Sequence, residues 1–202
     1  MRLEDAGGVP YPVHAHRGAS FVQVREGDRY RVRLTNRRAA RVEVVLSVDG
    51  VDVVTGRPAD PGRQRGYVLA PFGSIVVEGY RQSFDHVAAF RFVAPADGYA
   101  QAGPDEAGIL AAAVFEERPS RTRGLAWTPA YPVHHAPAAE SLVDEAPAAA
   151  SPEAGDASSS PVVVTGWGET TVQSVHPVRF RRHHPRRPDA VVYLFYEAQT
   201  ST

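Results

Sequence analysis

Hydrophobic and polar residues alternate along much of the chain, which is the pattern of β-strands that bury one face. Between residues 29 and 34, arginines alternate strictly with large hydrophobic residues. Valine and leucine then occupy every second position from 42 to 48 and run into Asp49-Gly50, a dipeptide favoured in two-residue hairpin turns. The pattern predicts two strands and then a hairpin whose returning strand covers residues 51–54.

Further short hydrophobic segments predict more strands, separated by turns rich in glycine and proline. One of them, 108–115, is hydrophobic on both faces, which favours a central strand or, as an alternative, a short buried helix. The last two strands should form a hairpin. The full set of these segments is 66–69, 74–80, 87–93, 108–115, 162–165, 171–180 and 190–196. The predicted fold class is therefore all-β, an antiparallel β-sandwich or a jelly-roll-like fold.

The composition changes between residues 119 and 160, where alanine, proline and serine dominate. Within this stretch, residues 136–160 hold five acidic side chains and no arginine. Such a sequence has too little hydrophobic surface to order itself alone, so we interpret it as a low-complexity connector or arm. The predicted organisation is a β-sandwich core over 1–118, the connector over 119–160, and C-terminal strands over 161–202 that complete the same core.

The overall composition excludes several kinds of chemistry. The 202 residues carry a formal net charge of −1, which gives no general attraction to nucleic acid or to membranes. Cysteine is absent, so disulfides, thiol nucleophiles and thiolate metal sites are excluded. All 22 basic residues are arginine, which excludes catalytic lysines and the lysine of a phosphate-binding loop and is typical of a GC-rich genome. We predict no cofactor.

No targeting or membrane segment is predicted from the sequence. Residues 1–8 lack the hydrophobic stretch of a secretion signal. The longest hydrophobic run, 108–115, is too short to cross a bilayer. We therefore expect a protein of the cytoplasm or of a virion.

Several of these segments resemble an uncharacterised family of β-rich bacterial and phage-associated proteins. The residues that carry the resemblance run from Arg25-Glu26-Gly27-Asp28-Arg29-Tyr30 through 45–50, 66–68, 78–81, 87–92 and 108–117 to Thr165-Gly166-Trp167-Gly168-Glu169. The resemblance covers most of the chain on both sides of the connector and implies one β-rich core. It implies no activity, cofactor or site residue.

His14-Ala15-His16 is the pattern that most resembles a metal site. Residues i and i+2 of a strand share a face, so both imidazoles could reach one cation. Jelly-roll cupins follow such a pair with a glutamate four or five positions later, but Ser20 and Phe21 stand there in this chain. Because a specific site needs three or four ligands, we interpret these residues as ordinary surface histidines and keep a metal site as the weaker alternative.

Ser83, Asp85 and His86 are the residue types of a hydrolytic triad. Asp85 and His86 are adjacent, so on a strand their side chains point to opposite faces and cannot orient one another. The nucleophile-elbow pattern is absent around Ser83. We interpret the three residues as a polar cluster at a loop or strand entry, and we do not expect an enzyme.

The predicted C-terminal hairpin has a strongly basic tip, formed by Arg179, Arg181, Arg182, His183, His184, Arg186 and Arg187. These side chains could hold phosphates, an acidic peptide or a nucleic-acid backbone. The alternative is a solvated loop whose charge is balanced by the acidic connector. Only Phe180 is interleaved for base stacking, so we favour a solvated loop or a protein contact over nucleic acid. The histidines would make any contact sensitive to pH.

The glycines of Gly166-Trp167-Gly168 predict a bulge or tight turn, with Trp167 packed over the core or at an interface. Together with Trp127 it is a candidate contact residue for a partner. Other aromatic residues could add stacking surfaces, namely Tyr67, Tyr80, Tyr99 and Tyr131.

The sequence favours a structural or assembly protein that associates with other protein subunits and forms oligomers. The specific expectation is a virion accessory protein of a phage with a GC-rich genome, such as a capsid decoration, cement or minor capsid protein. A carbohydrate- or ligand-binding β-sandwich module is the alternative. A jelly-roll metal enzyme built on His14 and His16 is the third hypothesis.

Overall fold

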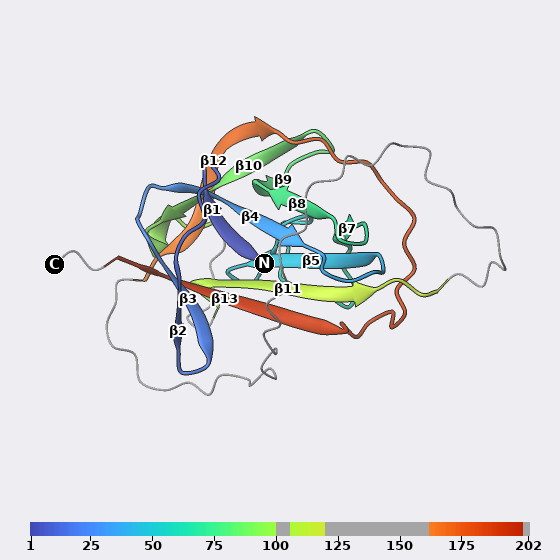
Figure 1. Ribbon diagram of the computed structural model, residues 1–202. Coiled ribbons are helices and arrows are strands. Elements are labelled where there is room, and N and C mark those ends of the chain that lie inside the picture. The colour runs from blue at the N-terminus through green and yellow to red at the C-terminus, as the bar shows by residue number, and fades with distance from the viewer. Residues whose placement is uncertain (100–105, 120–161, 200–202) are drawn as a thin grey trace, which may run out of the picture.

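The computed structural model describes residues 1–99, 106–119 and 162–199. In this part of the chain the fold is all-β, as predicted, and its strands form two mostly antiparallel sheets (Figure 1). The six-stranded sheet has the order β1-β4-β10-β12, with β8 beside β4 and β9 beside β10. Its strands are β1 (Arg2–Asp5), β4 (Arg29–Thr35), β8 (Ser74–Val77), β9 (Gly79–Arg81), β10 (His86–Val93) and β12 (Val164–Val172).

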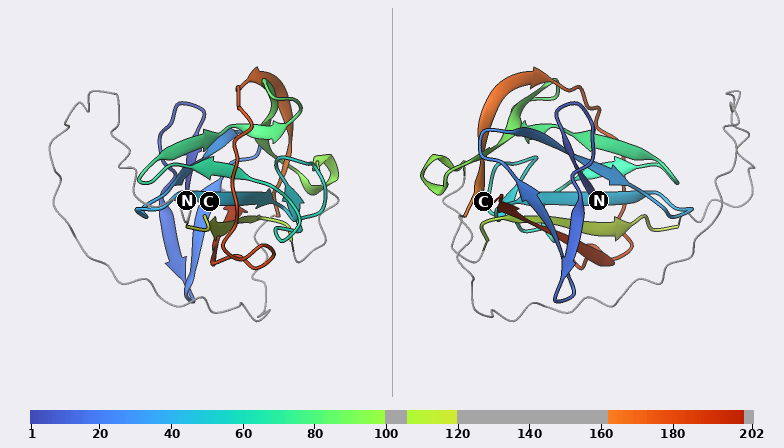
Figure 2. Two further views of the ribbon diagram at one scale, coloured as in Figure 1. Left: turned by 90° about the vertical axis from the view of Figure 1, so that its right-hand side faces the viewer. Right: turned by 60° about the vertical axis from the view of Figure 1, so that its left-hand side comes forward.

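The seven-stranded sheet has the order β2-β3-β13-β11-β5-β6, with β7 beside β5. Its strands are β2 (Val13–His16), β3 (Ala19–Val24), β5 (Val42–Val48), β6 (Val51–Asp52), β7 (Tyr67–Leu69), β11 (Ile109–Glu116) and β13 (Ala190–Ala198). Only the β3–β13 pair is parallel among the described strands. The N-terminal strands β1, β2 and β3 are additions to the predicted set. β2 and β3 form a hairpin that extends away from the body of the sandwich (Figure 2).

Both sheets contribute buried side chains to one hydrophobic core. The six-stranded sheet supplies Tyr30 and Phe92, whose rings stack with centroids 4.2 Å apart. The seven-stranded sheet faces them with residues that include Leu46, Leu110 and Tyr196. The chain on both sides of the gap at 120–161 therefore contributes to the same interior.

The Asp49-Gly50 hairpin is confirmed. Val48 pairs with Val51, and both turn residues have positive φ, 49° for Asp49 and 74° for Gly50. This is the backbone of a type I′ turn, whose twist matches that of the flanking strands.

The predicted hairpin of 171–180 with 190–196 is wrong. β12 ends at Val172 in the six-stranded sheet, whereas β13 lies between β3 and β11 in the other sheet. Residues 173–189 instead run from one sheet to the other (Figure 1). Pro177, which has no N–H for a strand ladder, lies in the middle of the segment that we expected to be extended.

The crossing segment 173–189 explains why β11 is hydrophobic on both faces. Phe180 of this segment packs against a second, smaller cluster formed by Val45, Ala113 and Phe115 on the outer face of the seven-stranded sheet. The prediction of a strand at 108–115 is therefore confirmed, together with its burial on two sides.

The glycines around Trp167 form the expected bulge. The register of β12 against β10 shifts between Ala88 and Phe90, so that an extra residue of β12 lies opposite Ala89. A Cβ on Gly168 would lie 2.9 Å from the carbonyl oxygen of Ala89, which explains why the bulge needs glycine there.

Candidate anion-binding surface

The prediction that Arg182 belongs to an exposed basic tip is wrong, because this residue is buried. Its side chain is 4% exposed, and its Nε donates to Glu43 Oε2 over 2.6 Å. The guanidinium also lies over the ring of Phe115, 3.6 Å from the centroid. Glu43 itself is 2% exposed, so the two charges form an ion pair inside the protein.

Arg182 also fixes the positions of two loops. Its Nη1 donates to the carbonyl oxygens of Pro61 and Pro185, over 2.7 and 3.3 Å, and its Nη2 donates to that of Gln64 over 2.5 Å. Glu43 completes the arrangement by accepting from the N–H of Gly66 over 3.0 Å. One buried guanidinium therefore joins the β6–β7 loop, the crossing segment and β5.

The two loops enclose a hollow of about 300 Å³ on the surface. We call it the arginine hollow. Its lining residues come from three separate parts of the chain, and they are Gly62, Arg63, Gln64, Arg65, Arg118, Phe180, Arg181, Arg182 and Pro185. Five of these are arginine and none of the described lining residues is acidic. Arg118 is placed by its backbone, because its N–H donates to the carbonyl oxygen of Arg181 over 2.7 Å.

Acidic side chains near the arginine hollow neutralise only part of its charge. Arg65 lies 3.7 Å from the buried Glu43, which it shares with Arg182, and Arg63 lies 3.5 Å from Asp60. The side chains of Arg63 and Arg65 stay 75% and 71% exposed. Guanidinium groups that remain exposed and grouped in this way can bind carboxylates or phosphates with paired hydrogen bonds.

The rest of the basic segment is exposed to solvent. Arg179, Arg181, Arg186 and Arg187 are exposed, as are both histidines. Arg41, the residue before β5, donates to the carbonyl oxygen of Arg179 over 3.2 Å. This hydrogen bond holds the start of the basic segment against the sandwich. The acidic connector, which is the predicted charge partner of a solvated loop, lies outside the described residues.

His14 and His16 lie on the projecting strand β2, and both are exposed. His16 packs edge-on against Phe21, with ring centroids 6.3 Å apart. The described residues that could hold a metal ion as a group of three lie elsewhere, at His183, His184 and Asp189.

Ser83, Asp85 and His86 form the turn that leads into β10. Ser83 Oγ accepts from the backbone N–H groups of Asp85 and His86, over 3.2 and 3.1 Å, and lies 3.3 Å from His86 Nδ1. The hydroxyl therefore serves as the acceptor that closes the turn.

Trp167 is half exposed on β12, and Trp127 lies outside the described residues. The ring of Trp167 packs on Tyr99 at 4.9 Å between centroids, and Tyr99 packs on the buried Tyr80 at 4.5 Å. Tyr67 is also buried, so among the described aromatic candidates Trp167 offers the most exposed ring.

The Asp49 turn also holds a buried polar network, which the sequence pattern of a hairpin turn does not predict. Asp49 Oδ2 accepts from the N–H of Thr165 over 2.7 Å, and Oδ1 accepts from that of Gly108 over 2.8 Å. Tyr196 donates its hydroxyl proton to this carboxylate, with oxygen distances of 2.7 and 2.6 Å. Burial raises the pKa of Asp49, while the bonds from Tyr196 and Thr165 oppose that rise. The network joins the turn to both C-terminal strands and is structural.

The described part of the chain holds no helix with the length and hydrophobicity needed to cross a bilayer. Comparison with known families, curated proteins and solved structures gives no match for this chain. The resemblance to a β-rich bacterial and phage-associated family therefore stays a prediction.

Proposed function

We propose that this chain is a non-catalytic assembly protein that uses its arginine hollow to bind an acidic surface of another protein subunit. The observation that supports this most strongly is the grouping of Arg63, Arg65, Arg118 and Arg181 around one hollow. The β6–β7 loop, the residues after β11 and the crossing segment each contribute to it. The buried Arg182 holds the β6–β7 loop and the crossing segment together.

A protein partner is favoured over nucleic acid by the shape and surroundings of the hollow. Single-stranded nucleic acid is usually bound in an extended basic groove with aromatic side chains for base stacking. Here the basic lining encloses a compact space, and its aromatic ring, Phe180, is partly buried against the smaller cluster on the outer face of the seven-stranded sheet.

A phage virion is the assembly that we propose as the setting, with the chain acting as an accessory protein on the shell. The projecting hairpin of β2 and β3 supports such a role, because it extends an exposed arm beyond the sandwich (Figure 2). Oligomerisation with other copies or other subunits is part of the same proposal.

The proposal is tested by fluorescence anisotropy with two labelled probes of equal charge, an oligo-glutamate peptide and a single-stranded oligonucleotide. The key variant replaces Arg63, Arg65 and Arg181 with alanine. We expect it to bind the peptide roughly tenfold more weakly, since each exposed pair contributes about 0.5 kcal/mol. A matched control removes the same charge at Arg2, Arg17 and Arg57, which lie outside the hollow.

The control variant should bind the peptide as the unmodified protein does. Equal losses in the two triple variants would show that only total charge matters and would contradict the assigned surface. If the oligonucleotide binds more tightly than the peptide, the partner is nucleic acid and not an acidic protein surface.

Carbohydrate binding is a second candidate, favoured by the half-exposed ring of Trp167 supported from below by Tyr99. Such a flat aromatic surface can stack against a sugar ring. Glycan-array binding that is lost in Trp167→Ala and kept in the arginine variant would favour this function. If no glycan on the array is bound, carbohydrate binding is no longer supported as a function.

A further inference from the structure

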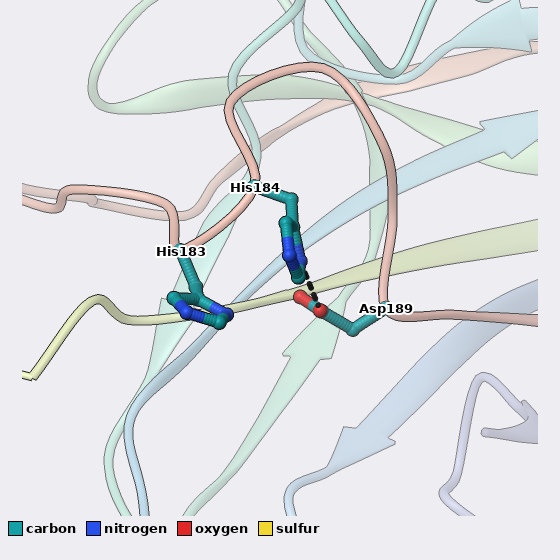
Figure 3. A group of neighbouring side chains, drawn as sticks. All are labelled: His183, His184 and Asp189. Atoms are coloured by element: carbon teal, nitrogen blue, oxygen red, sulfur yellow. Dashed lines mark hydrogen bonds and ion pairs between the residues drawn. The ribbon is translucent and has the colours of Figure 1, made fainter.

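Three potential metal ligands meet in the last loop of the crossing segment (Figure 3). One ligand atom from each of His183, His184 and Asp189 lies within 4.8 Å of the other two. His184 Nδ1 is 2.9 Å from Asp189 Oδ1, and the two imidazole rings are 4.3 Å apart between centroids. Figure 3 shows the carboxylate and the ring of His184 pointing toward one another, with the ring of His183 beside them.

The backbone holds these three residues in place. The N–H of His183 donates to the carbonyl oxygen of Glu116 over 2.8 Å, and the N–H of Glu116 donates to Asp189 Oδ2 over 2.7 Å. The N–H of Asp189 donates to the carbonyl oxygen of Val114 over 2.8 Å. Both ends of the loop are thus fixed to β11, and the buried Arg182 precedes the first ligand. A carboxylate whose second oxygen is already hydrogen-bonded is oriented as the ligands of metal sites usually are.

We propose that His183, His184 and Asp189 bind a divalent transition-metal ion of the zinc type. Imidazole nitrogen and carboxylate oxygen are ligands that Zn²⁺ accepts in tetrahedral sites, and three protein ligands leave one position for water. Calcium and magnesium prefer sites made of oxygen ligands, so two imidazoles select against them. Binding replaces the hydrogen bond between His184 Nδ1 and Asp189 with bonds from both side chains to the metal. The proton leaves Nδ1 at this step, and the neutral ring carries its proton on Nε2 instead.

The local charge sets a limit on the affinity. Two neutral imidazoles and one carboxylate bring a charge of −1 to the ion, whereas Arg186 and Arg187 lie in the same loop and are exposed. Their positive charges oppose a cation, but they are screened by water and salt because they are exposed. We therefore expect reversible binding rather than a permanently bound ion.

The test is a titration of the full chain, freed of metal by a chelator, with Co²⁺ followed by visible absorbance and with Zn²⁺ followed by calorimetry. We expect one ion per chain and an absorbance band of tetrahedral cobalt. His183→Ala and His184→Ala should each weaken binding roughly tenfold or more. Asp189→Asn, which keeps an oxygen for the N–H of Glu116, should weaken binding without loosening the loop.

Two histidine pairs elsewhere in the chain provide matched controls. One control variant replaces both His14 and His16 with alanine, and the other replaces both His134 and His135. Each removes two imidazoles and should bind Co²⁺ normally. Circular dichroism checks that every variant is folded. Unchanged affinity in folded His183→Ala, or loss of binding in either control variant, would overturn the proposed site.

Discussion

Arg182 and Glu43 are the residues on which the arginine hollow depends. Replacing Arg182 with methionine keeps much of the packing on Phe115 but leaves the carboxylate of Glu43 buried beside only the more distant Arg65. Removal of one partner from a buried ion pair costs about 3–5 kcal/mol. We expect Arg182→Met to lose this amount of unfolding free energy, measured by urea denaturation.

A second variant separates the cost of the lost pair from the cost of an unpaired charge. Glu43→Gln combined with Arg182→Met removes both charges, and the introduced amide keeps an oxygen for the N–H of Gly66. This double variant should be more stable than Arg182→Met alone. Equal stability of the two would mean that the buried carboxylate is not the source of the cost.

Tyr196 and Tyr30 make different hydrogen bonds in the Asp49 network, so they should contribute different amounts to the stability of the fold. Tyr196 donates to the buried carboxylate, whereas the Tyr30 hydroxyl bonds to Thr165 Oγ1 over 2.6 Å. Hydrogen bonds to charged groups contribute about 1.5–3 kcal/mol, compared with about 1 kcal/mol for neutral ones. Thermal unfolding should therefore show a larger destabilisation in Tyr196→Phe than in Tyr30→Phe. The reverse order would contradict the assigned hydrogen bond from Tyr196 to the side chain of Asp49.

Glu4 should make the protein sensitive to acid. It is 2% exposed, and the hydrogen bond from Arg33 lowers its pKa, with Arg31 adding to the effect. A lowered folded-state pKa gives stability that is present above the ordinary glutamate pKa and is lost as pH falls through the lowered value. The stability difference between the unmodified protein and Glu4→Gln should be constant above about pH 5 and shrink below about pH 4. An equal stability difference in the two pH ranges would contradict a stabilising role of the charged Glu4 side chain.

At the residue level, the sequence located the basic segment but could not identify its buried member. The other six arginines and histidines of the segment are exposed, and the partner of Arg182, Glu43, is 139 positions away. Glu43 itself occupies the polar position of an alternating strand, where an exposed side chain is expected. Burial of both depends on long-range contacts with the crossing segment and the β6–β7 loop.

At the level of elements, close approach of backbones makes particular glycines essential. A Cβ on Gly79 would lie 1.9 Å from the carbonyl oxygen of Ala88 on the neighbouring strand β10. Gly79→Ala must therefore push β9 away from β10, and overpacking of this kind costs about 1–3 kcal/mol or more. Gly7→Ala, where the nearest atom is the side-chain oxygen of Asp5 at 3.3 Å, is the control and should change stability little. Similar melting temperatures for the two variants would contradict the tight β9–β10 pairing.

The alternation of hydrophobic and polar residues predicted most strands, because one face of each sheet is buried. It could not show which strands pair with one another. The segment from 171 to 180 contains strand-forming residues, and β12 does continue to Val172. Beyond it, Gln173 and Val175 donate their backbone N–H groups to the carbonyl oxygens of Asp85 and Phe84 in a distant turn. These hydrogen bonds take the place of the strand–strand hydrogen bonds that a hairpin would require. No local sequence pattern predicts them.

At the level of the whole molecule, the proposed function depends on how the chain crosses between its two sheets. The crossing places Arg181 beside Arg63, Arg65 and Arg118, although more than 100 positions separate the β6–β7 loop from the crossing segment. The sequence could identify one basic cluster of this surface and not the others, because Arg63 and Arg65 belong to an ordinary polar loop when considered alone. The hollow is a product of the tertiary fold.

The most direct measurement of the central claim is the NMR spectrum of the arginine Nε–Hε groups during titration with the oligo-glutamate peptide. We expect the signals of Arg63, Arg65, Arg118 and Arg181 to shift together along one binding curve, while those of the three control arginines stay fixed. Shifts spread evenly over the exposed arginines, or confined to those outside the hollow, would contradict the proposed docking surface.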